Sequence, residues 1–408
     1  MIFCKNCDKI ILQNVEYFQN IRKEISVITQ RKWRTLIKEE YTEAIHDVIY
    51  LCACAVNETI PDRNKTAEMN LDILYKAAQK HSLTAAVAYA LESVGIKDHA
   101  FEQEKAKSIR KITLMEFEKA RLFERLEENG IWYAPLKGCI VKELYPSIGM
   151  RQMSDFDILY DKDHSAELQE IMLSLGFTCE ESGKGHQDVY YKQPVCNFEM
   201  HTKLFSERHK KEIFEYYRSV KDRLIKNEND RYGYHFNIND FYIYLIAHEY
   251  KHYIQGGTGI RSLLDTYILW QKCGHELDHD YIQKECLKMG IDDFEHKNKE
   301  LALRLFDGKD LTAQDIELLD YYISSGTYGT LENDLQNSVN NYGGGKKGKR
   351  KYIFQKLFMP MDHIKAVYPI VYRHKILLPG LFVYRLCKAI TVKRKDTMKK
   401  LKILRKAK

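Results

Sequence analysis

The stretch SDFDILY, residues Ser154–Tyr160, alternates strictly between two kinds of side chain. The alternation sorts its members onto two sides: Asp155, Asp157 and Leu159 on one, and Phe156, Ile158 and Tyr160 on the other. Because successive side chains of a β-strand point to opposite faces, this period of two predicts a strand. We expect the apolar side to anchor the strand in a core and the two aspartates to be accessible to solvent.

A second alternating stretch, VCNFEMHTKL, spans Val195–Leu204 and places Asn197, Glu199 and His201 on one side. Between the two stretches, residues 163–175 predict a helix closed by Gly176. FTCEE and DVYYK predict two more strands around a glycine-containing turn, and IWYAP at 131–135 is a short apolar run before them. Residues 131–204 are therefore predicted to form a small α/β unit with a mixed sheet.

The polar sides of these two strands carry three carboxylates, from Asp155, Asp157 and Glu199. Residues i and i+2 of a strand lie on one face, about 6.6 Å apart at Cα, so the two aspartates can hold a divalent cation together. Three neighbouring carboxylates repel one another unless cations neutralise them. The pattern favours a Mg²⁺ (or Mn²⁺) site, although alternating acids also occur on ordinary surface strands.

Basic residues precede the aspartates. Lys137 and Gly138 stand at a predicted turn between a strand and a short helix, where glycine lets the backbone approach a phosphate and the helix N-terminus attracts an anion. Arg151 can pair with a phosphate or with a carboxylate. The alternatives are an ordinary strand-to-helix turn and a structural ion pair. Together with the carboxylates, these residues favour phosphoryl chemistry with two metal ions.

Composition excludes several classes of protein. The chain has 408 residues, of which 44% are hydrophobic and 30% charged, with only 7 Pro and 21 Gly, so it is not a disordered or low-complexity protein. The sequence contains no run of about 18 uncharged apolar residues, so it predicts no membrane span. Charges in the opening MIFCKNCDKI argue against a signal peptide, and ten scattered cysteines suit a reducing compartment. We therefore expect a cytoplasmic protein.

The formal net charge of +7 is concentrated at the end of the chain. Residues 388–408 contain ten Lys/Arg and one acid, a net charge of +9, so the remaining 387 residues carry −2. This basic tail is expected to bind RNA, an acidic partner or anionic lipid weakly, or to be a frayed, solvated helix.

Outside the sheet, the sequence predicts helices. In the first 130 residues, Asn70–Leu91 and Ser108–Glu128 show apolar residues at helical spacing, the first without turn signals and the second ending at Asn129-Gly130. Later helices are predicted at Asn239–Ile254, Ile260–Trp270 and Ala313–Ser324. The stretch NNYGGGKKGKRK, residues 340–351, predicts a mobile surface loop.

Three further motifs resemble known functional sites but are incomplete. HEYKH, His248–His252, fits the H-E-x-x-H pattern of zinc hydrolases, but no third ligand follows at a recognised spacing. GGGKKGKR, Gly343–Arg350, resembles a P-loop but lacks the Ser/Thr and the preceding strand. Cys4-x-x-Cys7 is at most half of a zinc site, and free thiols are favoured.

One block of sequence resembles a known family. LKGCIVKELYPSIGMRQMSDFDILYDKD, residues 136–163, is similar to the core motif of an uncharacterised bacterial nucleotidyltransferase family within the polymerase-beta-like nucleotidyltransferase superfamily. The pattern is Leu-Lys-Gly, a short helix ending in Tyr-Pro, and then Gly-x-Arg-x-x-x-Asp-x-Asp-Ile-Leu. A later Glu-x-His motif is met by Glu199 and His201. The similarity continues over roughly residues 70–390, and residues 131–204 are its most specific part.

The resemblance implies an α+β fold in which a nucleotidyltransferase core with a small mixed β-sheet, residues 131–210, is flanked by helical segments at 1–130 and 211–387. It implies Mg²⁺ ligands at Asp155, Asp157 and Glu199, and nucleotide phosphates near Lys137, Gly138 and Arg151. Close to these groups we place His201, His252 and Arg261. The chain departs from the wider superfamily at Cys139, where the turn usually carries Gly or Ser.

The function implied is transfer of a nucleoside monophosphate from an NTP to an acceptor hydroxyl, with release of pyrophosphate. The acceptor is left open between a small molecule, a protein and an RNA end. A degenerate domain that binds nucleotide without turnover is the alternative, because Cys139 removes a usual phosphate contact. A zinc hydrolase built on HEYKH is a distant third.

Overall fold

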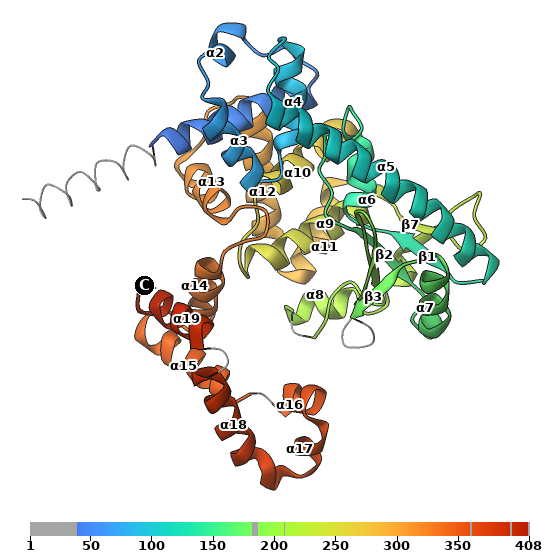
Figure 1. Cartoon of the computed structure of the whole chain (residues 1–408), viewed down its shortest axis with the longest axis vertical. Helices are drawn as coiled ribbons and strands as arrows, with labels where there is room; N and C mark the ends of the chain where they lie inside the picture. Colours follow the sequence, from blue (N-terminus) through green and yellow to red (C-terminus); the bar gives the residue numbers. More distant parts are fainter. Residues whose placement is uncertain (1–38, 182–186, 208, 360, 392–393, 407–408) are drawn as a thin grey trace, which may run out of the picture.

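The computed structural model describes residues 39–181, 187–207, 209–359, 361–391 and 394–406. It is an α+β fold in which a five-stranded mixed sheet is flanked by helices from both ends of the chain, as the sequence predicts (Figure 1). The Cys4-x-x-Cys7 motif and the glycine-containing turn at 182–186 lie outside the described residues. Within the described ranges, no helix has both the length and the apolar character that crossing a membrane requires.

The sheet has the strand order β1-β2-β5-β4-β3. Its strands are β1 (Tyr133–Pro135), β2 (Phe156–Tyr160), β3 (Thr178–Glu181), β4 (Gln187–Lys192) and β5 (Cys196–His201). The central strands β2 and β5 run parallel, whereas every other neighbouring pair is antiparallel. A parallel pair needs a long crossover connection, which here consists of the helix α7 (Ser165–Ser174) followed by β3 and β4. The predicted mixed sheet is confirmed.

Both faces of β2 are buried, in two different cores. Phe156, Ile158 and Tyr160 are fully buried in a core shared with α7 and the long helix α5 (His99–Glu128). Leu159 points the other way and joins a larger core formed mainly by helices. Asp157 shares that second face and is only 6% exposed. The expected solvent accessibility is therefore wrong for Asp157, because the helices that follow the sheet cover the polar face of the strand.

The helices before the sheet follow the sequence with one correction. Instead of one continuous helical stretch over Asn70–Leu91, the chain forms α3 (Leu71–Lys80) and α4 (Thr84–Ser93). The break falls at Ser82, whose φ of 54° ends the first helix although no Gly or Pro marks the turn. The predicted end of α5 is confirmed, since Asn129 is its C-cap and Gly130 follows with φ of 70°. Residues 39–56 and α2 (Arg63–Ala67) are also helical.

The chain between β1 and β2 is compact, with a short helix α6 (Gly138–Val141) and a 3₁₀ turn η1 (Lys142–Leu144). Helices dominate after β5. They are α8 (Lys211–Tyr216), α9 (Ile238–Tyr253), α10 (Ile260–Cys273), α11 (His279–Met289), α12 (Asp292–Phe306) and α13 (Ala313–Ser325). The predictions for α9, α10 and α13 are confirmed. No sequence pattern predicted the hairpin of β6 (Leu224–Lys226) and β7 (Tyr234–Phe236), whose strands have only three residues each.

A polar network joins three of these helices in the core. The Tyr322 hydroxyl of α13 lies 2.7 Å from Glu249 Oε1 of α9 and 2.6 Å from Asn298 Oδ1 of α12, and Asn298 Nδ2 donates to Glu249 Oε2 at 3.1 Å. A hydroxyl has one proton to donate. The ring of hydrogen bonds closes when Tyr322 donates to Asn298 and a protonated Glu249 donates to Tyr322. Burial raises the pKa of Glu249 to about 7, which agrees with this arrangement.

The expected mobile loop at 340–351 is wrong. Residues 331–341 form α14 (Leu331–Asn341) and the helix α15 (Gly345–Leu357) begins only four residues later, so Tyr342, Gly343 and Gly344 alone form the turn. Gly348 lies inside α15, where an added Cβ would come within 2.3 Å of the Val339 carbonyl oxygen. This glycine allows two helices to pack closely, which a glycine-rich composition cannot distinguish from flexibility.

The rest of the chain is also helical. It contains α16 (Met361–Val367), α17 (Pro369–Arg373), the 3₁₀ turn η5 (Lys375–Leu377), α18 (Leu378–Ile390) and α19 (Arg394–Lys406). Within the basic tail, residues 394–406 form α19, which is anchored through Leu404 in a small core with Leu335, Val339 and Tyr352. In Figure 1 this C-terminal part, α14 to α19, extends away from the body that holds the sheet.

The Glu249 network predicts a pH-dependent effect of Glu249→Gln. Glutamine can keep the ring closed, because its amide donates to Tyr322 where the protonated carboxyl did. As pH rises from about 4.5 to about 7, an unfolded chain ionises Glu249 freely while the folded chain resists it, so wild-type stability falls by about 3 kcal/mol from this group. In urea unfolding, the free energy of unfolding of Glu249→Gln, relative to that of the wild type, should therefore rise by about this amount between pH 5 and 8.

The matched control is Glu317→Gln, at an exposed position of α13. If the difference in unfolding free energy between Glu249→Gln and the wild type stayed constant over this pH range, Glu249 would not hold its proton in the fold.

Candidate active site

The predicted site residues gather around one pocket between the sheet and helices α9 and α10. The cavity measures about 390 Å³. Its wall includes every site residue that the sequence predicts except His201: Lys137, Gly138, Arg151, Asp155, Asp157, Glu199, His252 and Arg261. His201 lies next to this wall and contacts Asp157. Residues up to 124 positions apart in the chain thus meet at one place.

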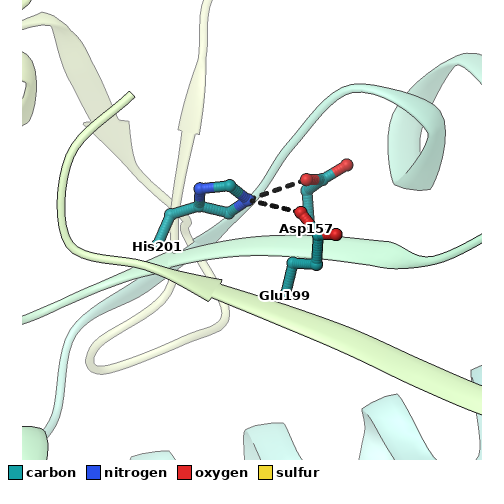
Figure 2. A group of neighbouring side chains, drawn as sticks. All are labelled: Asp157, Glu199 and His201. Carbon is teal, nitrogen blue, oxygen red and sulfur yellow. Dashed lines mark hydrogen bonds and ion pairs between the residues drawn. The ribbon is translucent and has the colours of Figure 1, made fainter. Parts of the chain in front are cut away.

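The parallel register of β2 and β5 places Asp157 directly beside Glu199. Two residues further along β5, His201 points its Nε2 atom at both carboxylates, 2.7 Å from Asp157 Oδ1 and 3.7 Å from Glu199 Oε2 (Figure 2). Ligand atoms of all three side chains lie within 4.8 Å of one another. In the described part of the chain, this is the only group of His, Cys, Asp and Glu close enough to hold a metal ion.

Asp157 is the most constrained member of the group. Its Oδ1 accepts hydrogen bonds from Lys137 Nζ and from His201 Nε2, both at 2.7 Å. Although burial favours the neutral form, the positive charge of Lys137 and the bond from His201 hold the pKa of Asp157 well below its ordinary value. The carboxylate is therefore ionised and fixed in orientation.

The two carboxylates near Asp157, those of Asp155 and Glu199, are not balanced by neighbouring positive charge. Burial, followed by the charge of Asp157, raises the pKa of Asp155. Burial and the charges of Asp157 and Asp155 raise the pKa of Glu199 to about 7, and Gln187 Nε2 donates to Glu199 Oε2 at 2.8 Å. A divalent cation among these oxygens would relieve the repulsion, and carboxylate ligands suit Mg²⁺ or Mn²⁺. Asp157 and Glu199 therefore fit such an ion. His201 Nε2 donates to Asp157 and so orients that carboxylate, and Asp155 lies outside this group of close ligand atoms.

Arg151 forms the structural ion pair that was one of its two sequence-based interpretations. Its Nε and Nη2 donate to the two carboxylate oxygens of Asp265 in α10, at 2.8 and 2.7 Å, and the Tyr145 hydroxyl also donates to Asp265 at 2.8 Å. This buried fork ties the segment between α6 and β2 to the helical layer. Lys137 is similarly engaged with Asp157, so their contact with a nucleotide stays a prediction.

Gly138 and Cys139 hold this turn together. A Cβ at Gly138 would lie 2.5 Å from Arg151 Nη1 and 2.7 Å from Met153 Cε, so the glycine makes room for the Arg151 side chain. Cys139 is buried in the core beneath the sheet, where its thiol donates to the Asp157 carbonyl at 3.6 Å. In this structure Cys139 faces away from the pocket and packs as a small apolar residue.

Cations from the helical layer face the carboxylates. Lys251 and His252 of α9 and Arg261 of α10 line the pocket, and the Arg261 Nη1 donates to the Gln152 carbonyl at 3.0 Å. Burial, followed by the charge of Lys137, lowers the pKa of Lys251 to about 8, and burial followed by the charge of Arg151 lowers that of Arg261. Among the described residues, neither Lys251 nor Arg261 has a carboxylate within ion-pair distance. Sequence reasoning missed Lys251, although its spacing from His248 and His252 puts all three on one helix face.

The zinc-hydrolase pattern HEYKH is not arranged for that chemistry. His248 Nε2 and His252 Nε2 lie 3.2 Å apart, but the intervening Glu249 is bound by Tyr322 and Asn298 in the core. A zinc hydrolase needs this glutamate as a general base beside the metal. The glutamate of the motif is therefore engaged in the helical core rather than free to act as that base.

Of the comparisons with known proteins, the family comparison agrees with the motif around Asp157. No curated protein and no solved structure matches the chain. The model of the uncharacterised nucleotidyltransferase family matches residues 67–307, which include all the residues of the candidate site. The match stops short of residue 390, to which we extended the resemblance. Because it spans more than half of the sequence, the chain belongs to the uncharacterised nucleotidyltransferase family.

Proposed function

We propose that this protein transfers a nucleoside monophosphate from an NTP to an acceptor hydroxyl and releases pyrophosphate. One observation carries the proposal: three carboxylates, on β2, β5 and the segment before β2, line one pocket together with Lys251 and Arg261, which have no carboxylate within ion-pair distance among the described residues. In such a site the carboxylates can bind divalent metal ions while the basic side chains bind a polyphosphate next to them. Membership of the nucleotidyltransferase family supports the same reaction class.

Asp155, Asp157 and Glu199 are proposed to hold Mg²⁺ or Mn²⁺. When bound, such ions neutralise the phosphate charge and lower the pKa of an attacking hydroxyl. Asp157 is suited to fix the position of a ligand, because Lys137 and His201 hold its carboxylate rigidly. Glu199 is half-buried at the pocket, and we assign it the acceptor side, where it receives the proton of the attacking hydroxyl.

The polyphosphate is assigned to the helical layer. Lys137 and Arg151 already bind Asp157 and Asp265, whereas Lys251 and Arg261 offer charge to the pocket without such a partner among the described residues. Desolvated cations bind a phosphate anion more strongly than exposed ones. Lys251 and Arg261 would therefore hold the β- and γ-phosphates, to a similar extent in the ground state and in the transition state.

Loss of the acidic residues is predicted to abolish transfer. The assay incubates purified protein with each labelled NTP and Mg²⁺ or Mn²⁺, offering the protein itself, small hydroxyl compounds and RNA as acceptors. Asp155→Asn and Glu199→Gln should each lower the rate by more than about 100-fold, because the charge that they balance develops during transfer.

Asp163→Asn is the matched control, since Asp163 is an exposed carboxylate just beyond the end of β2. Equal rates in the wild type and both acidic variants would remove the transferase assignment. Metal-dependent NTP binding without transfer to any acceptor would instead favour the degenerate binding module.

Substitutions of Lys251 and of Glu199 are predicted to change different kinetic constants. Lys251→Met removes a charge that attracts phosphate in the ground state and the transition state alike, so KM for the NTP should rise roughly tenfold with little change in kcat. Glu199→Gln should reduce kcat, because its role arises as the hydroxyl attacks. Steady-state kinetics at saturating acceptor separate the two effects, with Lys272→Met, on the exposed side of α10, as the control.

An unchanged KM in a folded Lys251→Met variant would move the polyphosphate away from α9 and return it to the Lys137–Gly138 turn.

A further inference from the structure

Positive charge is concentrated in the C-terminal helices well before the tail. Residues 345–408 contain twenty Lys/Arg and only two acids, Asp362 and Asp396, a net charge of +18. Since the whole chain carries +7, residues 1–344 carry −11. The chain therefore joins an acidic body to a strongly basic extension, and the extension is folded into α15 to α19 rather than forming an unstructured tail.

The same extension exposes large aliphatic side chains. Among the described residues of α16 to α18 they are Val367 (49% exposed), Ile370 (68%), Ile376 (89%), Leu377 (46%), Val383 (62%), Leu386 (47%) and Ile390 (60%), which we call the apolar patch. Figure 1 shows α16, α17 and α18 at the end of the molecule that projects away from the sheet. An exposed apolar surface of this kind marks a binding surface.

Helix α18 shows that the exposure is organised. Val383, Leu386 and Ile390 follow one another at intervals of three and four residues, so they form a stripe along one side of the helix. Leu381 on the same helix is only 6% exposed and faces the protein. Exposed basic residues lie among the members of the apolar patch, with Arg373 and Lys375 between Ile370 and Ile376, and Lys388 between Leu386 and Ile390.

We propose that α16 to α18 dock this protein on an anionic membrane surface, with the apolar patch inserted among the acyl chains and the basic residues at the headgroups. Reversible binding of a helix at a membrane surface combines these two contributions, buried apolar area and attraction to anionic lipid. The occupant follows from the charge and the chemistry of the patch.

Other occupants fit these residues less well. A second copy docked patch against patch would bring together two C-terminal extensions, residues 345–408, that each carry a net charge of +18, which opposes association. RNA would use the basic residues and could stack on Tyr384, which is 53% exposed on α18, but it gains little from the seven aliphatic side chains of the apolar patch. Anionic lipid is the partner that uses both the charge and the aliphatic side chains.

The test is co-sedimentation of the full-length protein with vesicles made of equal parts phosphatidylcholine and phosphatidylglycerol, and with vesicles of phosphatidylcholine alone. We expect binding to the anionic vesicles that weakens as salt is raised. Ile376→Ser, Val383→Ser and Ile390→Ser together should reduce it by more than about tenfold, because three aliphatic side chains no longer leave water. Lys375→Gln with Lys388→Gln should reduce binding to the anionic vesicles as well.

The control variant is Ile60→Ser with Leu287→Ser, which removes two equally exposed aliphatic residues from the body, 74% and 64% exposed. It should bind as the wild type does. Absence of vesicle binding by the wild type, or equal binding by the triple-serine variant, would overturn the proposal. A dimeric wild type that becomes monomeric with the same three substitutions, as measured by analytical sedimentation, would also overturn the proposal, because the patch would then contact a second copy. Transferase activity is not the readout, so the result is independent of the proposed reaction.

Discussion

A buried carboxylate at the junction of two parallel strands constrains the rest of the site. Asp157 lies on β2, a strand enclosed on both faces, and an ion in that position is costly unless neighbouring groups compensate it. Lys137 and His201 supply the compensation, one from the turn after β1 and the other from β5. The parallel register of β2 and β5, the folded-back turn at Lys137 and the ionised state of Asp157 therefore depend on one another.

The remaining charges divide into satisfied and unsatisfied groups, and the difference indicates function. Arg151 and Asp265 neutralise each other in a buried fork that joins the sheet region to α10. Asp155 and Glu199 have raised pKa values because burial and mutual repulsion are not fully balanced, while Lys251 and Arg261 have lowered ones for the corresponding reason. A protein that binds nothing gains no stability from such a division. A site that receives cations and a polyphosphate uses both halves.

The sequence predicted local features well and distant contacts poorly. Alternation in SDFDILY identified β2 and sorted its residues correctly onto two faces, because that information lies within seven residues. It could not show that α9, some ninety residues later, covers the face that carries Asp157. Nor could composition reveal that Gly348 serves close packing of α14 and α15, or that Lys251 joins the pocket. These features depend on tertiary contacts that local patterns do not encode.

Direct titration of Mn²⁺, followed by the electron paramagnetic resonance signal of the free ion, tests the metal site without requiring a known acceptor. The account predicts that the wild-type protein takes up Mn²⁺, that a non-hydrolysable NTP analogue strengthens the uptake, and that Asp155→Asn with Glu199→Gln abolishes it while Asp163→Asn does not. Identical titration curves for the wild type and the folded double variant would contradict the assignment of this pocket as a metal-dependent nucleotide site.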